Sequence, residues 1–182
     1  MIHECPKAQP IRATRCNLAH EFHIAQLVHI DPAIAADIHH VMMMAYTVEA
    51  KLLGVTDFPP LWRTADDIGL ADSSFLGSFQ NNLLLGVLEY ETSFANSIAV
   101  AAVVVLPRFF RLGIASAMIK HIIRRHDGTR IEVCTAAANR PALSLYRQHN
   151  FAVAETWLNG DDIPMVRLLR EPQAGDTTPY KG

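Results

Sequence analysis

The sequence predicts a single α/β domain in which helices flank a central mixed sheet. The chain has 182 residues and 50% of them are hydrophobic, which suits one buried core and leaves little room for two. Segments with the period of a strand alternate with segments with the period of a helix. The apolar, β-branched run 98–106 has the character of a strand buried on both faces. We expect an arm at 1–20, the domain at 21–170 and a polar tail at 171–182.

The first half of the chain predicts a strand, a long helical segment and a hairpin. Asp31 can cap a helix because its side chain accepts hydrogen bonds from the free N–H groups of a first turn, where Pro32 is tolerated. No helix breaker follows before Gly54, so this segment is one helix or two joined ones. Two adjacent asparagines between strand-like segments favour a tight turn. The expected elements are a strand at 22–28, the helical segment at 32–53, a loop or short helix at 61–72, and strands at 74–80 and 83–92.

The second half alternates strands with two helices. Arg124 and Arg125 suit the last turn of a helix because cations stabilise its negative end, and Gly128 favours its termination. Asn139 can cap the next helix, and Asn150 can close it because asparagine accepts a left-handed backbone. The expected elements are strands at 98–106, 130–135, 151–158 and 163–169, a helix at 113–126 and a helix between 139 and 150.

The composition argues against several classes of protein. The longest strictly apolar run is 98–106, well short of the roughly 20 residues that a membrane helix needs. Residues 1–21 lack an apolar stretch of signal-peptide length, so a cytoplasmic location is the default expectation. The 3 cysteines are odd in number and lack the paired spacing of a zinc or thioredoxin-like site, so we expect reduced thiols.

The charges are distributed unevenly along the chain, although the formal net charge is only -2. Residues 98–147 hold eight basic and two acidic side chains, whereas residues 31–97 hold two basic and nine acidic ones. The basic segment suits an anionic ligand and the acidic segment a cationic one. The side chains of the acidic segment are Asp31, Asp37, Glu49, Asp57, Asp66, Asp67, Asp72, Glu89 and Glu91, against Lys51 and Arg63.

The segment 103–116 combines the features of an anion-binding site. It joins the buried strand to a helix through Arg108, Arg111 and Gly113. The first amides of a helix point outward at the positive end of its dipole, and a glycine there lets a ligand approach the backbone closely. A phosphate or pyrophosphate would fit this place. The alternative is a plain connection with solvated arginines.

Two segments resemble motifs of the GNAT acetyltransferase superfamily. Residues 105–115, VLPRFFRLGIA, resemble its pyrophosphate-binding loop, and residues 139–151, NRPALSLYRQHNF, resemble its Asn-x-x-Ala-x-x-Leu-Tyr-x-x-x-Gly-Phe helix. The sequence departs from these motifs at two positions, because Phe110 stands where the loop has Gln or Arg and Asn150 stands where the helix motif has Gly. The segments 46–50 and 54–61 also resemble a bacterial subgroup of the superfamily.

The resemblance implies a mostly antiparallel sheet whose two central strands splay apart and receive the pantetheine arm of acetyl-CoA. It implies that this arm pairs with the backbone of Val103 to Val105, and that Arg111 and the amides after it hold the pyrophosphate. It further implies that Asn139 contacts the arm and that Tyr146 protonates the departing thiolate. The donor-binding residues implied in this way are Val103, Val104, Val105, Arg111, Leu112, Gly113, Ile114, Ala115, Ser116, Asn139, Ala142 and Tyr146.

A base must accept the proton of the attacking ammonium group, directly or through water. Glu89 and Glu91 lie two residues apart on one predicted strand, so their side chains project to the same face, beside the strand with Val103 to Val105. These two glutamates are the candidate bases. Weaker candidates are His39, His40 and Tyr46.

Each candidate also has an ordinary structural interpretation. Tyr146 could be a half-buried helix tyrosine with its hydroxyl in water. Glu89 and Glu91 could form the solvated face of a hairpin. His39 and His40, which precede three methionines, fit core packing better than a metal site because no carboxylate or cysteine completes a ligand set. We therefore expect no metal.

The expected function is transfer of an acetyl group from acetyl-CoA to a primary amine, by direct attack in a ternary complex. The acidic segment is expected to attract a cationic amine, in a small molecule or a peptide. Three alternatives stay open: a domain that binds acyl-CoA without catalysis, a nucleotide-binding module and an interaction protein. Nucleic acid is not expected, because the basic residues lack interleaved aromatic residues on a strand and the chain as a whole is acidic. A membrane partner is not expected either, and a homodimer is left open.

Overall fold

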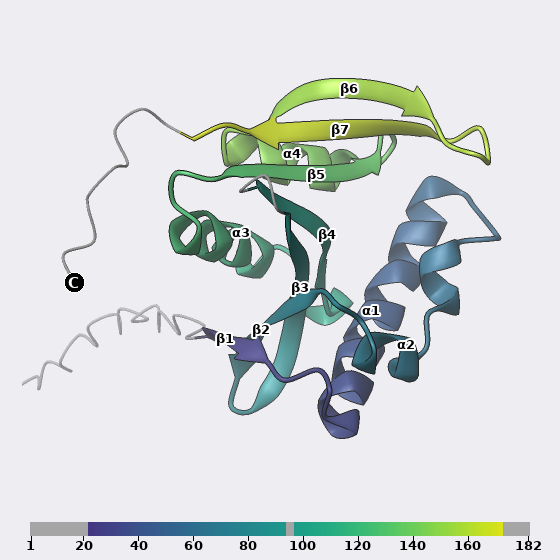
Figure 1. Ribbon diagram of the computed structural model, residues 1–182. Coiled ribbons are helices and arrows are strands. Elements are labelled where there is room, and N and C mark those ends of the chain that lie inside the picture. The colour runs from purple at the N-terminus through teal and green to yellow at the C-terminus, as the bar shows by residue number, and fades with distance from the viewer. Residues whose placement is uncertain (1–21, 94–96, 173–182) are drawn as a thin grey trace, which may run out of the picture.

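The computed structural model describes residues 22–93 and 97–172 (Figure 1). The arm expected at 1–20 and most of the tail expected at 171–182 lie outside the described residues, so the domain boundaries stay predictions. None of the described helices is long and apolar enough to cross a membrane. The described residues also contain no group of three or more His, Cys, Asp or Glu side chains that could hold a metal ion.

A single sheet of seven strands forms the centre of the molecule. The strands are β1 (His23–Leu27), β2 (Ser74–Gln80), β3 (Leu83–Ser93), β4 (Ser97–Val105), β5 (Arg130–Ala136), β6 (Ala152–Leu158) and β7 (Pro164–Arg170). Their spatial order is β1-β2-β3-β4-β5-β7-β6. All neighbours are antiparallel except β4 and β5, which are parallel. The mixed, mostly antiparallel sheet is thus confirmed.

Helices cover both faces of this sheet (Figure 1). They are α1 (Pro32–Leu53), the 3₁₀ turn η1 (Pro59–Trp62), α2 (Ala65–Gly69), the 3₁₀ turn η2 (Pro107–Phe109), α3 (Ile114–Arg125) and α4 (Arg140–Gln148). α1 and α2 pack on one face, over the half formed by β1 to β4. α3 and α4 pack on the other face. The fold therefore has three layers, with the sheet in the middle.

The ends of the elements follow from local sequence chemistry. The Asp31 carboxylate accepts a hydrogen bond from the Ala33 N–H at 2.8 Å and so caps α1. Gly54 ends α1 in the left-handed conformation, with φ 69°. The segment between them is therefore one helix and not two. Asn81 and Asn82 have φ 48° and 64°, as the tight turn between β2 and β3 requires.

The sheet opens between β4 and β5. These strands pair only between residues 97–100 and 130–133. Beyond that point β4 stays paired with β3 as far as Val105, and β5 stays paired with β7 as far as Ala136. The register of β4 against β3 shifts at Ala101, which has no partner in β3. Such a bulge bends and twists its strand, and here it directs β4 away from β5. The expected splay is confirmed.

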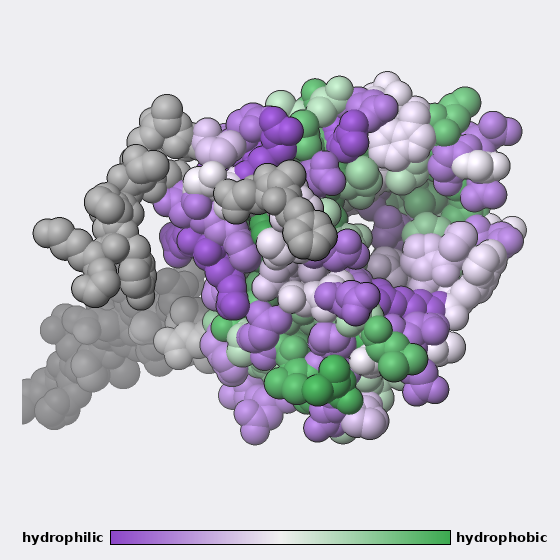
Figure 2. Space-filling view, in the orientation of Figure 1, coloured by the Kyte–Doolittle hydropathy of each residue, from purple (hydrophilic) through white to green (hydrophobic). Residues whose placement is uncertain are grey.

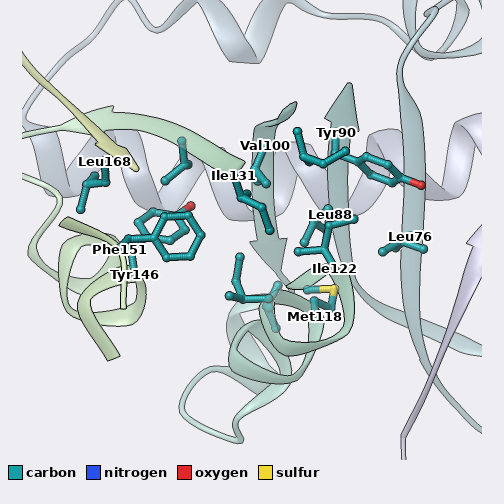
Figure 3. Close-up of a cluster of buried hydrophobic side chains, with 14 of the residues drawn as sticks. Leu76, Leu88, Tyr90, Val100, Met118, Ile122, Ile131, Tyr146, Phe151 and Leu168 are labelled. Carbon is teal, nitrogen blue, oxygen red and sulfur yellow. The ribbon is translucent and has the colours of Figure 1, made fainter. Parts of the chain in front are cut away.

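Two hydrophobic clusters hold the layers together, one on each face of the sheet. In the cluster under α3 and α4, Met118 and Ile122 pack against Leu88 of β3, while Tyr146 and Phe151 lie together beside β7 (Figure 3). The cluster under α1 draws on β1 to β4, and none of its described members comes from β5, β6 or β7. The part of the sheet that α1 covers therefore ends where β4 and β5 separate.

Candidate functional site

Both central strands lead into a helix that begins at the open end of the sheet. β4 and β5 run in the same direction, and they separate toward their C-terminal ends. α3 follows β4 through the loop at 106–113, and α4 follows β5 through a loop of three residues, Ala137, Ala138 and Asn139. The positive ends of two helix dipoles thus lie on the two sides of one opening. This arrangement suits a ligand with negative charge.

The loop that begins α3 has the geometry of an anion site. Gly113 is the N-cap residue with φ 81°, and no side chain caps this helix end. A Cβ atom built on Gly113 would meet nothing within 4 Å, so the space in front of the first turn is open. Arg111 has φ 64°, an unusual backbone conformation for a residue other than glycine. The first amides of the twelve-residue α3 are thereby left for a ligand.

The side chains around this loop include an exposed arginine and two that contact other side chains. Arg111 is exposed, and Arg108 stacks over the ring of Phe109 at 4.8 Å from the ring centroid. The Ser116 hydroxyl lies 2.9 Å from Nε2 of His149, at the C-terminal end of α4. Burial lowers the pKa of His149, and the charges of nearby cations lower it further. The neutral imidazole therefore links the first turn of α3 to α4.

Asn139 connects α4 to α1 across the opening. Its Oδ1 atom accepts a hydrogen bond from the Ala142 N–H at 3.1 Å, which confirms the predicted cap of α4. Its Nδ2 atom donates to Oε1 of Glu49 at 2.8 Å. Asn139 is buried, with 9% of its surface exposed. One amide side chain therefore fixes the start of α4 and the position of a carboxylate on α1.

Glu49 stands where the core-facing stripe of α1 turns polar. Ile38, Met42 and Ala45 follow one another at helical spacing and are buried against the sheet. Tyr46, which packs against the edge of this apolar cluster, and Glu49, which follows it, continue the stripe by one turn. Figure 2 shows the surface hollowed between α1 and the part of the sheet that contains β5 and β7. The hydrogen bond from Asn139, which directly follows β5, joins Glu49 to that part of the sheet.

The environment of Glu49 makes its carboxyl group more basic than that of an exposed glutamate. Burial raises the pKa of its carboxyl group, and the hydrogen bond from Asn139 opposes this rise in pKa only in part. No sequence argument selected Glu49 as a site residue. Its spacing could have indicated it, because Glu49 lies one helical turn after Ala45 on the apolar stripe of α1. An acid in such a position must either bind a polar partner or face a cavity.

Two tyrosine hydroxyls lie near this carboxylate. Tyr146 is only 5% exposed and packs against Phe151 with ring centroids 5.6 Å apart, so it is a core tyrosine and not a half-buried one. Burial raises its pKa, and the charge of Glu49 raises it further. The pKa of Tyr46 is also raised, by burial and then by Glu89 and Glu49. Both hydroxyls therefore stay protonated at neutral pH.

Glu89 is closed in a buried ion pair. Both of its carboxylate oxygens accept from Arg63, at 2.6 Å and 2.9 Å, and the Ser73 hydroxyl donates to it at 2.6 Å. The Glu89 side chain is 7% exposed and that of Arg63 25%. The hydrogen bonds to Glu89 raise the pKa of Arg63. Because its hydrogen-bonding capacity is used by these partners, Glu89 is poorly placed to take a proton from a ligand.

The other candidate residues lie in different surroundings. Glu91 is exposed at the end of β3, so the two glutamates of that strand do not share one environment. His40 is exposed and His39 half-buried, both more than a turn before Tyr46 on α1. On β4, Val104 and Val105 are buried and Val103 is half-buried. The structure thus brings Asn139 and Tyr146 together with Glu49, and it brings Tyr46 near Glu89 and Arg63.

Comparison with known proteins identifies the family. The model of the acetyltransferase (GNAT) family matches residues 37–151. The chain is 37% identical over 131 residues to the UPF0157 protein YqkA of Bacillus subtilis (strain 168), an alignment that covers 71% of this chain and 38% of that protein. The chain therefore spans well under half the length of this curated relative.

Solved structures with the same fold include two N-acetyltransferases. The ribosomal-protein-S18-alanine N-acetyltransferase from Escherichia coli superimposes with a TM-score of 0.66 at 15% identity, covering 88% of this chain and 100% of that one. The PaiA N-acetyltransferase from Thermoplasma acidophilum, in complex with coenzyme A, gives 0.64 at 16% identity, with 83% and 99% covered. At these identities the likeness concerns the fold.

The ion pair between Arg63 and Glu89 should matter for stability. We expect Arg63→Met to lower the free energy of unfolding by about 3 kcal/mol, because the change leaves a buried carboxylate with only the Ser73 hydroxyl as a partner. Urea denaturation measures this loss. Arg130→Met is the control, because Arg130 and Glu171 form a pair whose side chains are 54% and 57% exposed. The control should change the free energy by less than about 0.5 kcal/mol, and equal losses would contradict the prediction.

Proposed function

The chain belongs to the acetyltransferase (GNAT) family, and on that basis we propose that it transfers an acetyl group from acetyl-CoA to a primary amine. The proposed route is direct attack of the amine in a ternary complex. The observation that supports it best is the opening of the sheet beside the uncapped start of α3. We also propose the boundaries 21–170 for the catalytic domain, which enclose the matched region 37–151.

The opening fits the shape of the donor. Past Val100 the edge of β4 that faces β5 is not paired with it, so its backbone groups can bind an extended chain that contains amides, such as pantetheine. We assign Val103, Val104 and Val105 to this role. The pyrophosphate would bind at Arg111 and the amides of Leu112, Gly113, Ile114, Ala115 and Ser116. When bound, acetyl-CoA supplies an acetyl group activated as a thioester.

The other side of the opening supplies polar groups. We propose that Asn139 and Ala142, at the start of α4, contact the donor. Tyr146 would donate the proton that the departing sulfur needs. Its raised pKa supports this role, because the hydroxyl is protonated throughout the neutral range and is therefore available as a donor.

The acceptor side favours a cation. The charged groups that influence Tyr46 are Glu49, Glu89 and Arg63, which sum to one negative charge when all three are ionised. Arg63 is engaged with Glu89, so Glu49 carries the uncompensated charge. Tyr46 and Phe58 add an aromatic wall, with ring centroids 5.9 Å apart. We therefore propose a protonated amine as acceptor, in a small molecule or a basic peptide.

One observation favours a domain that binds acyl-CoA without catalysis. Glu89, the acid on the strand next to Val103 to Val105, is closed in its ion pair. An enzyme that depended on Glu89 as its base would lack a free carboxylate in this arrangement. A screen of amines with acetyl-CoA, scored by release of free thiol, separates the two functions.

If the loop before α3 binds the pyrophosphate, a negative charge placed at Gly113 should prevent binding of the donor. Gly113→Asp should abolish binding of coenzyme A, because a carboxylate at this helix end repels the pyrophosphate. Isothermal titration calorimetry measures the affinity. Gly113→Asn is the matched control, since it has the same size and the same left-handed backbone requirement but no charge. A folded Gly113→Asp variant that binds like the wild type would refute the loop assignment.

If Tyr146 protonates the departing sulfur, its loss should lower turnover without lowering the affinity for the donor. Tyr146→Phe keeps the packing against Phe151 and removes only the hydroxyl. We expect kcat to fall about 10²-fold while the Kd of acetyl-CoA changes little, because general acid catalysis contributes only in the transition state. Single-turnover kinetics and calorimetry measure the two quantities. Unchanged turnover in an assay limited by chemistry would exclude Tyr146 from proton transfer.

The charge of the acceptor side predicts a salt dependence. With a diamine as acceptor, kcat/KM should fall as ionic strength rises from about 0.01 to 0.15 M, because salt screens the attraction between unlike charges. An amino alcohol and an amino acid of similar size are the neutral and anionic comparisons. A preference for the anionic amine, or a rate with the diamine that is indifferent to salt, would contradict a cationic acceptor.

A further inference from the structure

We propose that Glu49 is the general base that takes the proton from the acceptor ammonium group. This inference rests on the proposed acetyl transfer and assigns a residue on α1 to a step for which the sequence favours Glu89 and Glu91 on β3. Glu49 would act as a catalytic residue in contact with the acceptor. The assignment depends on its free oxygen, its position and its surroundings.

The hydrogen bonds of Glu49 leave one oxygen available. Asn139 donates to Oε1 at 2.8 Å, and no other hydrogen bond to the Glu49 carboxylate occurs among the described residues. Among the described residues, the buried polar side-chain atoms without a hydrogen bond do not include Oε2 of Glu49. Because Oε2 has no hydrogen-bond partner in that part of the chain either, it must be accessible to solvent. Glu89 differs in this respect, because Arg63 binds both of its oxygens. Of these two glutamates, Glu49 is the one that combines an orienting hydrogen bond with a free proton acceptor.

The position of Glu49 puts this oxygen at the opening of the sheet. Its partner Asn139 is the N-cap of α4, directly after the end of β5. The hydroxyl of Tyr146, about two turns after Asn139 on α4, lies close enough for the charge of Glu49 to raise its pKa. The proposed acid and the proposed base therefore flank one place, where α1 passes the separated ends of β4 and β5.

The charged and titratable groups around Glu49 suit proton transfer. They are Tyr46 on α1 and Tyr146 on α4, and beyond them Glu89 on β3, Arg63 after η1 and Cys134 on β5. Burial raises the pKa of Glu49 and so brings its basicity closer to neutral pH. Both tyrosines remain neutral, and Arg63 is bound to Glu89. No cation therefore holds the Glu49 carboxylate in its ionised form among the described contacts.

The proposed step balances its protons and electrons. Glu49 takes one proton from the ammonium group, and the freed lone pair of nitrogen forms the new bond to the acetyl carbon. The carbon–sulfur bond breaks with its electron pair on sulfur, which takes the hydroxyl proton of Tyr146. The nitrogen then loses a second proton, which restores Tyr146, and the proton on Glu49 passes to water. The products are an amide, a free thiol and one proton.

Glu49→Gln tests the assignment with little change in structure. The amide oxygen of glutamine can still accept from Asn139, but glutamine cannot take a proton. We expect kcat/KM for the best amine to fall 10²- to 10⁴-fold near pH 7. The defect should shrink about tenfold per pH unit toward the pKa of the amine, because the variant depends on amine that is already neutral in solution. A purely structural role would give a defect that does not change with pH.

Two further measurements do not depend on turnover. The Kd of coenzyme A should be unchanged in Glu49→Gln by calorimetry. At pH 7 the variant should melt at a higher temperature than the wild type, because it lacks a carboxylate that is ionised against the cost of burial. A raised pKa in the folded state means that this cost vanishes below the pKa of the unfolded chain, about 4.3. The two melting temperatures should therefore converge at pH 4.

The outcomes separate this inference from the proposed function. Glu171→Gln is the matched control, because Glu171 is exposed and pairs with Arg130 at the surface, and its activity should equal that of the wild type. An active wild type with an equally active Glu49→Gln variant, or a defect independent of pH, overturns the role of Glu49 alone. A wild type that releases no thiol with any amine overturns both proposals.

Discussion

The bulge at Ala101 is the constraint on which the rest of the structure depends. β4 keeps its hydrogen bonds to β3, so the extra residue must be absorbed by a bend, and that bend takes β4 away from β5. Two parallel strands that separate at their C-terminal ends then deliver two helix N-termini to the same opening. The loop before α3 and the start of α4 therefore lie on the two sides of one opening.

The contact between α1 and α4 is stabilised by polar groups and not by apolar packing. Asn139 reaches Glu49 over a place where the apolar cluster under α1 has already ended. A half-buried carboxylate with one hydrogen bond is less stable in the folded state than an apolar side chain of similar size would be. The two hydrophobic clusters stabilise the fold independently of this contact, and the hydrogen bond from Asn139 holds the Glu49 carboxylate in a defined place.

Glu49 and Glu89 illustrate how hydrogen bonds decide what a carboxylate can do. Glu89 has a bidentate guanidinium and a hydroxyl as partners, and the resulting ion pair fixes the segment after η1 to β3. Glu49 has one neutral donor and an otherwise open side. The same side chain therefore serves as a structural anchor in one place and is available for chemistry in the other. Burial alone does not distinguish these two roles.

The sequence by itself determined the elements, their caps and the loop before α3, because these depend on contacts between residues close together in the chain. Asp31, Gly54 and Asn139 act on neighbours a few residues away. The sequence also located Glu89 on the strand beside Val103 to Val105. Only the tertiary structure decided which acid is free, because Arg63 lies 26 residues from Glu89 and Asn139 lies 90 residues from Glu49. The periodicity of the sequence specifies the face on which a side chain lies. The hydrogen-bond partner that the fold brings to that side chain determines whether it can accept a proton.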